Sequence, residues 1–187
     1  MISILLTHGA GSDANSKFLV ELDEALTAEG AYVFRYTLPF RQLGKMPNPT
    51  VAVLDREGLK RELERVRAER GGTIIAAGHS YGGRQITMLA GESPQTADRI
   101  VAMSYPLHPP NKPTQLRTQH LPNIQTPTLI VQGTRDEFGS QAEIESAAAL
   151  IPAPKRLLFL DGERHTFRRK VIVPVAKAIV EFASGKA

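Results

Sequence analysis

Short, unbroken apolar runs alternate along the chain with segments whose apolar residues recur at helical spacing. The first run, 2–6, is too short for a helix and lacks polar alternation, which is typical of a strand buried on both faces. The next segment, Phe18 to Leu26, predicts an amphipathic helix. Asp13 and Asn15 are candidate caps for its start. Further strands of the same kind are predicted at 32–36, 73–77, 100–104, 128–132 and 156–160.

Helical segments separate most of these strands. The other predicted helices cover 55–70, 83–90, 140–150 and a closing segment from about Pro174 to Gly185. Ser140 and Glu143 have the spacing of a capping box. Two proline-rich stretches, 37–50 and 105–127, are predicted to be irregular loops. Strands alternating with helices favour a parallel sheet with helices on both faces, in which ligands bind beyond the carboxyl ends of the strands.

The sequence Gly78-His79-Ser80-Tyr81-Gly82 lies between a predicted strand and a predicted helix. In that context, Gly-x-Ser-x-Gly predicts a sharp turn that presents the Ser80 hydroxyl at the end of the strand. Gly78 and Gly82 leave clearance for the flanking chain, and Gly83 lets the helix lie close to the strand. The alternative is a chance match in a glycine-rich turn, which the flanking strand and helix disfavour. We therefore predict that Ser80 is a nucleophile.

An acid and a base for this serine follow later strands. Asp136 and His165 come directly after the last two predicted strands, so a parallel sheet brings both to the edge where Ser80 lies. His165 would accept the Ser80 proton as a general base, and Asp136 would orient its imidazole and stabilise the charged form. Asp161 is the alternative acid because it is nearer to His165 in sequence.

Acyl-transfer chemistry also needs backbone donors for the oxyanion. Tyr81 N–H directly follows the predicted nucleophile. Ala10 N–H is the second candidate, because Gly9 and Gly11 on either side give the loop after the first strand the freedom to aim it. Side chains that could form a substrate pocket, with ordinary core or loop packing as an equal alternative, are Phe40, Tyr81, Tyr105, Leu107 and Phe138.

Composition excludes some function classes. The 187 residues include no cysteine, which excludes a disulfide scaffold and thiol redox chemistry. The net charge is +4, but basic residues are interleaved with Glu, so we expect no nucleic-acid ligand. The histidines form no metal-binding pattern, and we expect neither a metal nor a cofactor. His8 and His79 are expected to bond backbone groups, and His108 and His120 to be exposed.

The N-terminus leads from Met1 directly into the first apolar run, without a basic leader, and no run is long enough to span a bilayer. We therefore expect a cytoplasmic protein that makes no membrane contact, organised as one domain over residues 1–187. The sequence does not indicate an oligomeric state.

Four motifs together resemble the α/β-hydrolase superfamily: His8-Gly9-Ala10-Gly11, Gly78-His79-Ser80-Tyr81-Gly82-Gly83, Gly133-Thr134-Arg135-Asp136 and Gly162-Glu163-Arg164-His165. Over essentially its whole length the chain is similar to a small branch without a cap domain, near the dienelactone hydrolases. The resemblance implies an α/β-hydrolase fold, a three-layer sandwich with a mostly parallel sheet of about six strands. It also favours Asp136 over Asp161, because the family's acid usually follows the penultimate strand.

The resemblance has one departure that bears on function. Dienelactone hydrolases use a cysteine nucleophile, which this chain lacks, so a serine hydrolase is implied. Its expected partner is a small or medium carboxylic ester or thioester, cleaved through an acyl-enzyme by Ser80, His165 and Asp136. The alternatives are an interaction module with little turnover and an acyltransferase or peptidase using the same residues. Without a cap, specificity would depend on the loops 37–50 and 105–127.

Overall fold

The structure, a computed structural model, describes residues 1–185 and builds them around one sheet. All six strands in this part of the chain pair in parallel, in the order β2-β1-β3-β4-β5-β6. The strands are β1 (Ile2–Thr7), β2 (Tyr32–Tyr36), β3 (Thr73–His79), β4 (Arg99–Met103), β5 (Thr128–Gly133) and β6 (Lys155–Leu160). The predicted parallel sheet is confirmed, with every strand close to its predicted position.

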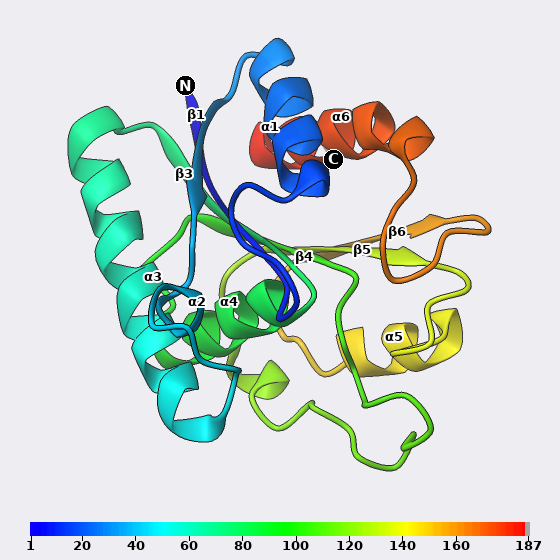
Figure 1. Cartoon of the computed structure of the whole chain (residues 1–187). Coiled ribbons are helices and arrows are strands. Elements are labelled where there is room, and N and C mark those ends of the chain that lie inside the picture. The colour runs from blue at the N-terminus through cyan, green and yellow to red at the C-terminus, as the bar shows by residue number, and fades with distance from the viewer. Residues whose placement is uncertain (186–187) are drawn as a thin grey trace.

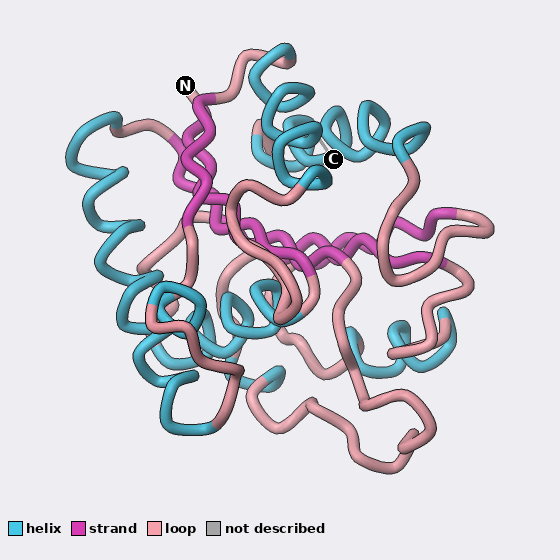
Figure 2. The backbone as a smooth tube through the Cα atoms, in the orientation of Figure 1, coloured by secondary structure: helices cyan, strands magenta, loops and turns pink. Residues whose placement is uncertain are grey.

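Helices cover both faces of this sheet (Figures 1 and 2). One face is covered by α1 (Lys17–Ala28) and α6 (Ile172–Ala183), and the other by α2 (Pro39–Gln42), α3 (Pro49–Arg70), α4 (Tyr81–Glu92) and α5 (Gln141–Ala148). The predicted three-layer sandwich is therefore confirmed, and residues 1–185 contain no separate cap. No helix within this range combines the length and the apolarity that crossing a bilayer requires.

The alternation of side chains along each strand explains why the central strands are mainly apolar at successive positions. In β1, Leu5 packs toward α3 and α4, whereas Ile4 and Leu6 pack toward α1 and α6. In β3, Ile74 and Ile75 divide in the same way. Because successive side chains point to opposite faces and both faces are covered, the run 2–6 does not alternate between apolar and polar residues, and its one polar side chain, Ser3, bonds the Gly71 carbonyl at 3.3 Å.

The strand order determines where the loops meet. β1 lies between β2 and β3, so the chain first builds the sheet in one direction and then in the other. Such a reversal opens a crevice beyond the carboxyl ends of the two central strands. The loop that begins at His8 and the turn at Ser80 leave these ends, and Gly82 N–H donates to the His8 carbonyl at 3.1 Å. Asp136 and His165 follow β5 and β6 at the same edge.

Three helix starts differ from the prediction, and the first is that of α2, which lies entirely inside the stretch 37–50 predicted to be an irregular loop. α3 begins at Pro49 inside the stretch predicted to be a loop, and the Asn48 side chain caps it by accepting the Val51 N–H at 3.0 Å. Proline suits a first helical turn because no donor is needed there, so the residue that indicated a loop instead starts the helix. α1 begins after Ser16 without a side-chain cap, while Asp13 accepts the Asn15 N–H in the preceding turn.

Candidate active site

Ser80 lies at the tip of the turn between β3 and α4, with φ 51° and ψ −116°, a conformation that non-glycine residues rarely adopt. The neighbouring glycines make this turn possible. A Cβ on Gly78 would lie 2.5 Å from the Gly83 nitrogen, and one on Gly82 would lie 2.6 Å from the His8 oxygen. The close approach predicted from the motif is therefore present on both sides of Ser80.

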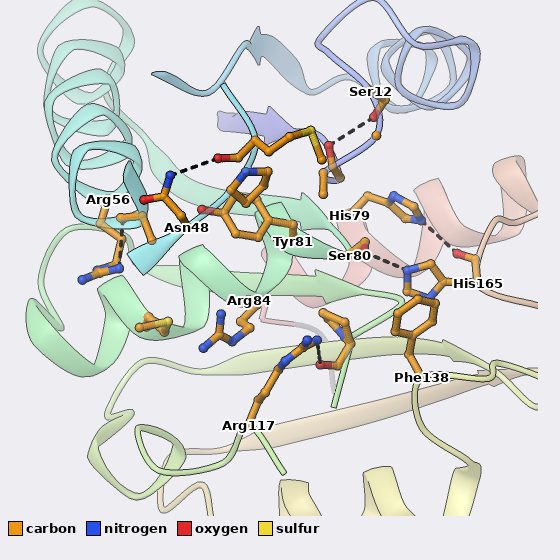
Figure 3. A pocket seen from close by; sticks show the side chains of 18 of the residues that line it. Ser12, Asn48, Arg56, His79, Ser80, Tyr81, Arg84, Arg117, Phe138 and His165 are labelled. Carbon is orange, nitrogen blue, oxygen red and sulfur yellow. Dashed lines mark hydrogen bonds between the residues drawn. The ribbon is translucent and has the colours of Figure 1, made fainter. Parts of the chain in front are cut away.

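A continuous chain of hydrogen bonds joins the three residues that the sequence singled out. Ser80 Oγ lies 2.7 Å from His165 Nε2 (Figure 3). His165 Nδ1 lies 2.9 and 3.0 Å from the two carboxylate oxygens of Asp136. A carboxylate can only accept, so Nδ1 carries the proton and Nε2 is free to accept one from the serine. Asp161, the alternative acid, instead accepts from the Thr134 hydroxyl at 3.4 Å.

The buried Asp136 carboxylate is held by donors alone. Besides His165, it accepts the Phe138 N–H at 2.9 Å and the Gln132 side-chain amide at 2.8 Å. The Gln132 carbonyl in turn accepts the Tyr105 N–H at 2.8 Å, which determines which end of that amide faces the carboxylate. This network fixes both the position of Asp136 and its acceptor role. Sequence reasoning missed Gln132, because its burial at the end of β5 depends on the packing of the following loop.

The turn that carries His165 is held by an ion pair and by ring contacts. Glu163 is buried, and the Arg168 guanidinium and N–H hold its pKa below the ordinary value. The Phe138 ring lies over the His165 ring, with 4.1 Å between their centres. The imidazole is therefore fixed by hydrogen bonds at its edges and by an aromatic ring at its face.

The other histidines have structural partners. His8 bonds the Gly9 carbonyl at 2.8 Å through Nδ1 and accepts the Leu38 N–H at 3.0 Å, as expected for a backbone-binding role. His79 Nε2 donates to the His165 carbonyl at 2.9 Å, and burial lowers its pKa to about 4. The prediction that His108 and His120 are exposed is wrong. His108 is buried, and the half-buried His120 bonds the Thr87 hydroxyl.

Ala10 and Tyr81, the residues predicted to supply the two oxyanion donors, both line the cavity that Ser80 borders. Tyr81 is the first residue of α4, so its N–H has no acceptor within the helix. Ala10 and its glycine neighbours line the cavity, and Arg41 braces their loop by donating to the Ala10 carbonyl at 3.0 Å. The Tyr81 hydroxyl donates to the buried Asp55 carboxylate at 2.7 Å, which anchors the side chain next to the nucleophile.

A cavity of about 930 Å³ opens above Ser80 and His165. Of the predicted pocket residues, Phe138 lines it, together with Tyr81. Three predictions are corrected: Phe40, Tyr105 and Leu107 are at most 2% exposed and pack in the core between the sheet and α3, α4 and α5. Their apolar character indicated only that they avoid water, which the core satisfies as well as a pocket would.

Several cavity residues were missed by the sequence reasoning. Three of them are arginines from different segments, and the other three lie just before α3 or in α4. The six residues are Met46, Asn48, Arg56, Arg84, Met88 and Arg117. Met46, Asn48 and Arg117 lie in the two loops, 37–50 and 105–127, that were expected to determine specificity. Arg84 follows Ser80 by four residues, and a helix places such residues on one face. Arg56 and Met88 had no comparable signal. Within residues 1–185, no group of three potential ligand side chains is arranged to hold a metal ion.

Comparison with known proteins gives one family and several structures of similar fold. A family described as "Alpha/beta hydrolase domain" matches residues 1–177. Dienelactone hydrolase from Anabaena variabilis is 21% identical with a TM-score of 0.78, covering 98% of this chain and 85% of that chain. Est1E from Butyrivibrio proteoclasticus, with bound ferulic acid, is 13% identical with a TM-score of 0.79, covering 100% and 90%. A serine hydrolase without a lid from Xanthomonas campestris is 17% identical with a TM-score of 0.74, covering 99% and 81%. At these identities the structures show a shared fold.

Proposed function

The chain belongs to the α/β-hydrolase domain family, and we propose that it is a serine hydrolase that cleaves a small or medium carboxylic ester or thioester. Family membership supports hydrolase activity in general. The observation that carries the finer proposal is the hydrogen-bonded chain from Ser80 Oγ through His165 to Asp136, with its serine end open to the cavity. Serine, histidine and a carboxylate in this order of contact make an activated nucleophile.

Acylation begins when Ser80 Oγ attacks the carbonyl carbon of the substrate and His165 Nε2 takes the hydroxyl proton. The carbonyl oxygen becomes an oxyanion, which Tyr81 N–H and Ala10 N–H stabilise. Asp136 stabilises the imidazolium that forms, since its carboxylate accepts from Nδ1 at 2.9 Å. His165 then gives the proton to the departing alcohol or thiol, and the acyl group stays on Ser80.

Deacylation repeats these steps with water as the nucleophile. His165 Nε2 takes a proton from the water as it attacks the acyl carbon, and returns it to Ser80 Oγ when the acid product leaves. The strained backbone of Ser80 holds its hydroxyl in the same place in both halves of the cycle.

A fluorophosphonate probe and an ester series test this proposal. The probe should label the wild-type protein and Ser12→Ala, a change at another cavity serine, but not Ser80→Ala. 4-Nitrophenyl esters of two to eight carbons and a matching thioester should release product with burst kinetics, and added alcohol measures acyl transfer against hydrolysis. A folded wild-type protein that neither labels nor hydrolyses any ester, or labelling that persists in Ser80→Ala, would overturn the proposal.

A further inference from the structure

The cavity wall has an unbalanced positive charge. Its lining residues within 1–185 include three arginines and no Asp or Glu. Arg56 is balanced, because its Nε donates to Glu92 at 2.8 Å. None of the ion pairs in the described part of the chain includes Arg84 or Arg117. Two guanidinium groups thus lie at the cavity without a carboxylate partner.

Arg84 is placed by the same helix that begins at the nucleophile. Its N–H donates to the Ser80 carbonyl at 3.0 Å, so the two residues lie one turn apart on the face of α4 that lines the cavity. Its Nε is buried and has no hydrogen-bond partner among residues 1–185. Buried polar groups are almost always paired, so the Arg84 guanidinium has donor capacity that residues 1–185 do not use.

Arg117 faces the same part of the cavity from the loop after β4 (Figure 3). The loop holds it at three points: its N–H donates to Leu107, its carbonyl accepts the Tyr105 hydroxyl at 2.6 Å, and its guanidinium donates to Pro106 at 2.9 Å. Burial and then the nearby Arg84 charge lower the pKa of Arg117. Two partly buried like charges repel each other, and an anion between them removes that cost.

We propose that Arg84 and Arg117 form a binding site for an anionic oxygen group, a carboxylate or a phosphate, on the substrate that Ser80 attacks. The fork of donors on each guanidinium matches the oxygens of either group. This inference rests on the proposed function and narrows its substrate class from esters in general to esters with an acidic substituent.

Matched ester pairs test the site. 4-Nitrophenyl hexanoate and mono(4-nitrophenyl) adipate share a six-carbon acyl chain and differ in a terminal carboxylate. Methyl 4-acetoxybenzoate and 4-acetoxybenzoate place the same difference on the leaving group. The wild-type protein should prefer the anionic member of one pair by about ten- to hundredfold in kcat/KM, the range expected for hydrogen bonds to a charged group.

Variants then assign that preference to the two arginines. Arg84→Gln and Arg117→Gln should each lower kcat/KM for the anionic ester about tenfold or more and leave its neutral partner within about twofold. Arg84→Lys should retain part of the preference. Arg70→Gln removes the same charge at the far end of α3 and should retain all of it. Competition by butyrate and by propyl phosphate against the neutral ester distinguishes a carboxylate site from a phosphate site.

The results separate this inference from the proposed function. Equal loss for the neutral and anionic esters would show that the arginines are structural and would overturn the inference. So would a wild-type protein that prefers neither anionic ester and binds neither competitor. If no ester is turned over, calorimetry of adipate and propyl phosphate binding to the wild type and to Arg84→Gln still decides whether the anion site exists.

Discussion

Replacing Asp136 by asparagine tests the candidate site at its most constrained point. Each partner of the carboxylate is a donor: His165 Nδ1, the Phe138 N–H and the Gln132 amide nitrogen. Asparagine has one oxygen and one NH₂ group. If the NH₂ takes the place of Oδ2 it faces the Gln132 amide nitrogen, and if it takes the place of Oδ1 it faces the Phe138 N–H. Gln132 cannot turn to relieve this, because its carbonyl already accepts the Tyr105 N–H.

The magnitude follows from these contacts. One buried donor is left facing another donor in either orientation, which should lower the free energy of unfolding by about 1–3 kcal/mol. The asparagine NH₂ also favours the His165 tautomer protonated at Nε2, which cannot accept the Ser80 proton. The equivalent change in serine proteases lowers kcat about 10⁴-fold, or about 5.5 kcal/mol of transition-state stabilisation.

Steady-state kinetics with 4-nitrophenyl esters and urea unfolding measure the two effects separately. Asp161→Asn is the matched control. Within residues 1–185, the one side chain that donates to the Asp161 carboxylate is Thr134, at 3.4 Å. It should change turnover by less than about twofold. A folded Asp136→Asn protein with turnover within about tenfold of the wild type would refute the role given to Asp136.

Three further predictions concern the supports of the site, each measured by urea unfolding. Gly82→Ala should lower the free energy of unfolding by about 1–3 kcal/mol, because its Cβ would lie 2.6 Å from a main-chain oxygen. Gly11→Ala, which has open space around its Cβ, should lower it by less than about 0.5 kcal/mol. Equal losses in the two variants would contradict the close approach at Gly82. Tyr81→Phe removes the hydrogen bond to Asp55 and should cost about 1.5–3 kcal/mol; no loss would mean that this bond does not stabilise the fold. Burial lowers the pKa of His79 to about 4, so the unfolded chain binds more protons between pH 6.5 and 4, and stability should fall as the pH drops through that window, by up to about 1.4 kcal/mol per pH unit. His79→Gln should have a correspondingly flatter pH dependence, and an unchanged slope would contradict it.

Periodicity was sufficient to predict the sheet, because its central strands are buried on both faces and form short, mainly apolar runs. It was less informative at helix starts, where a single proline has two opposite meanings. Pro49 falls in the stretch predicted to be a loop, yet it lies in the first turn of α3 with Asn48 as its cap. A proline starts a helix when the residues that follow it can pack against the rest of the protein. Val51 does this, because its side chain lies in the core.

The positions of Ser80, Asp136 and His165 could be predicted to converge because each follows a strand of one parallel sheet. The pocket could not be predicted in the same way. Phe40 is buried where α2 folds over α3, with its N–H bonded to Asp55, and this depends on a loop path that no local pattern encodes. Side-chain type alone does not distinguish an apolar core from an apolar cavity wall.

The two arginines of the proposed anion site differ in how closely they are tied to the nucleophile. Arg84 is one helical turn from Ser80, and about 6 Å of rise separates their backbones, so any change that moves the elbow moves this guanidinium with it. Arg117 belongs to a loop that is anchored through Tyr105, and Tyr105 in turn bonds the same Gln132 that holds Asp136. Both arginines are therefore mechanically coupled to residues of the hydrogen-bonded chain, although they come from separate segments. The distance between the nucleophile and the proposed anion site is therefore set by α4 at Arg84 and by the anchored loop at Arg117, which suits a substrate with a short spacer between its acidic group and its scissile carbonyl.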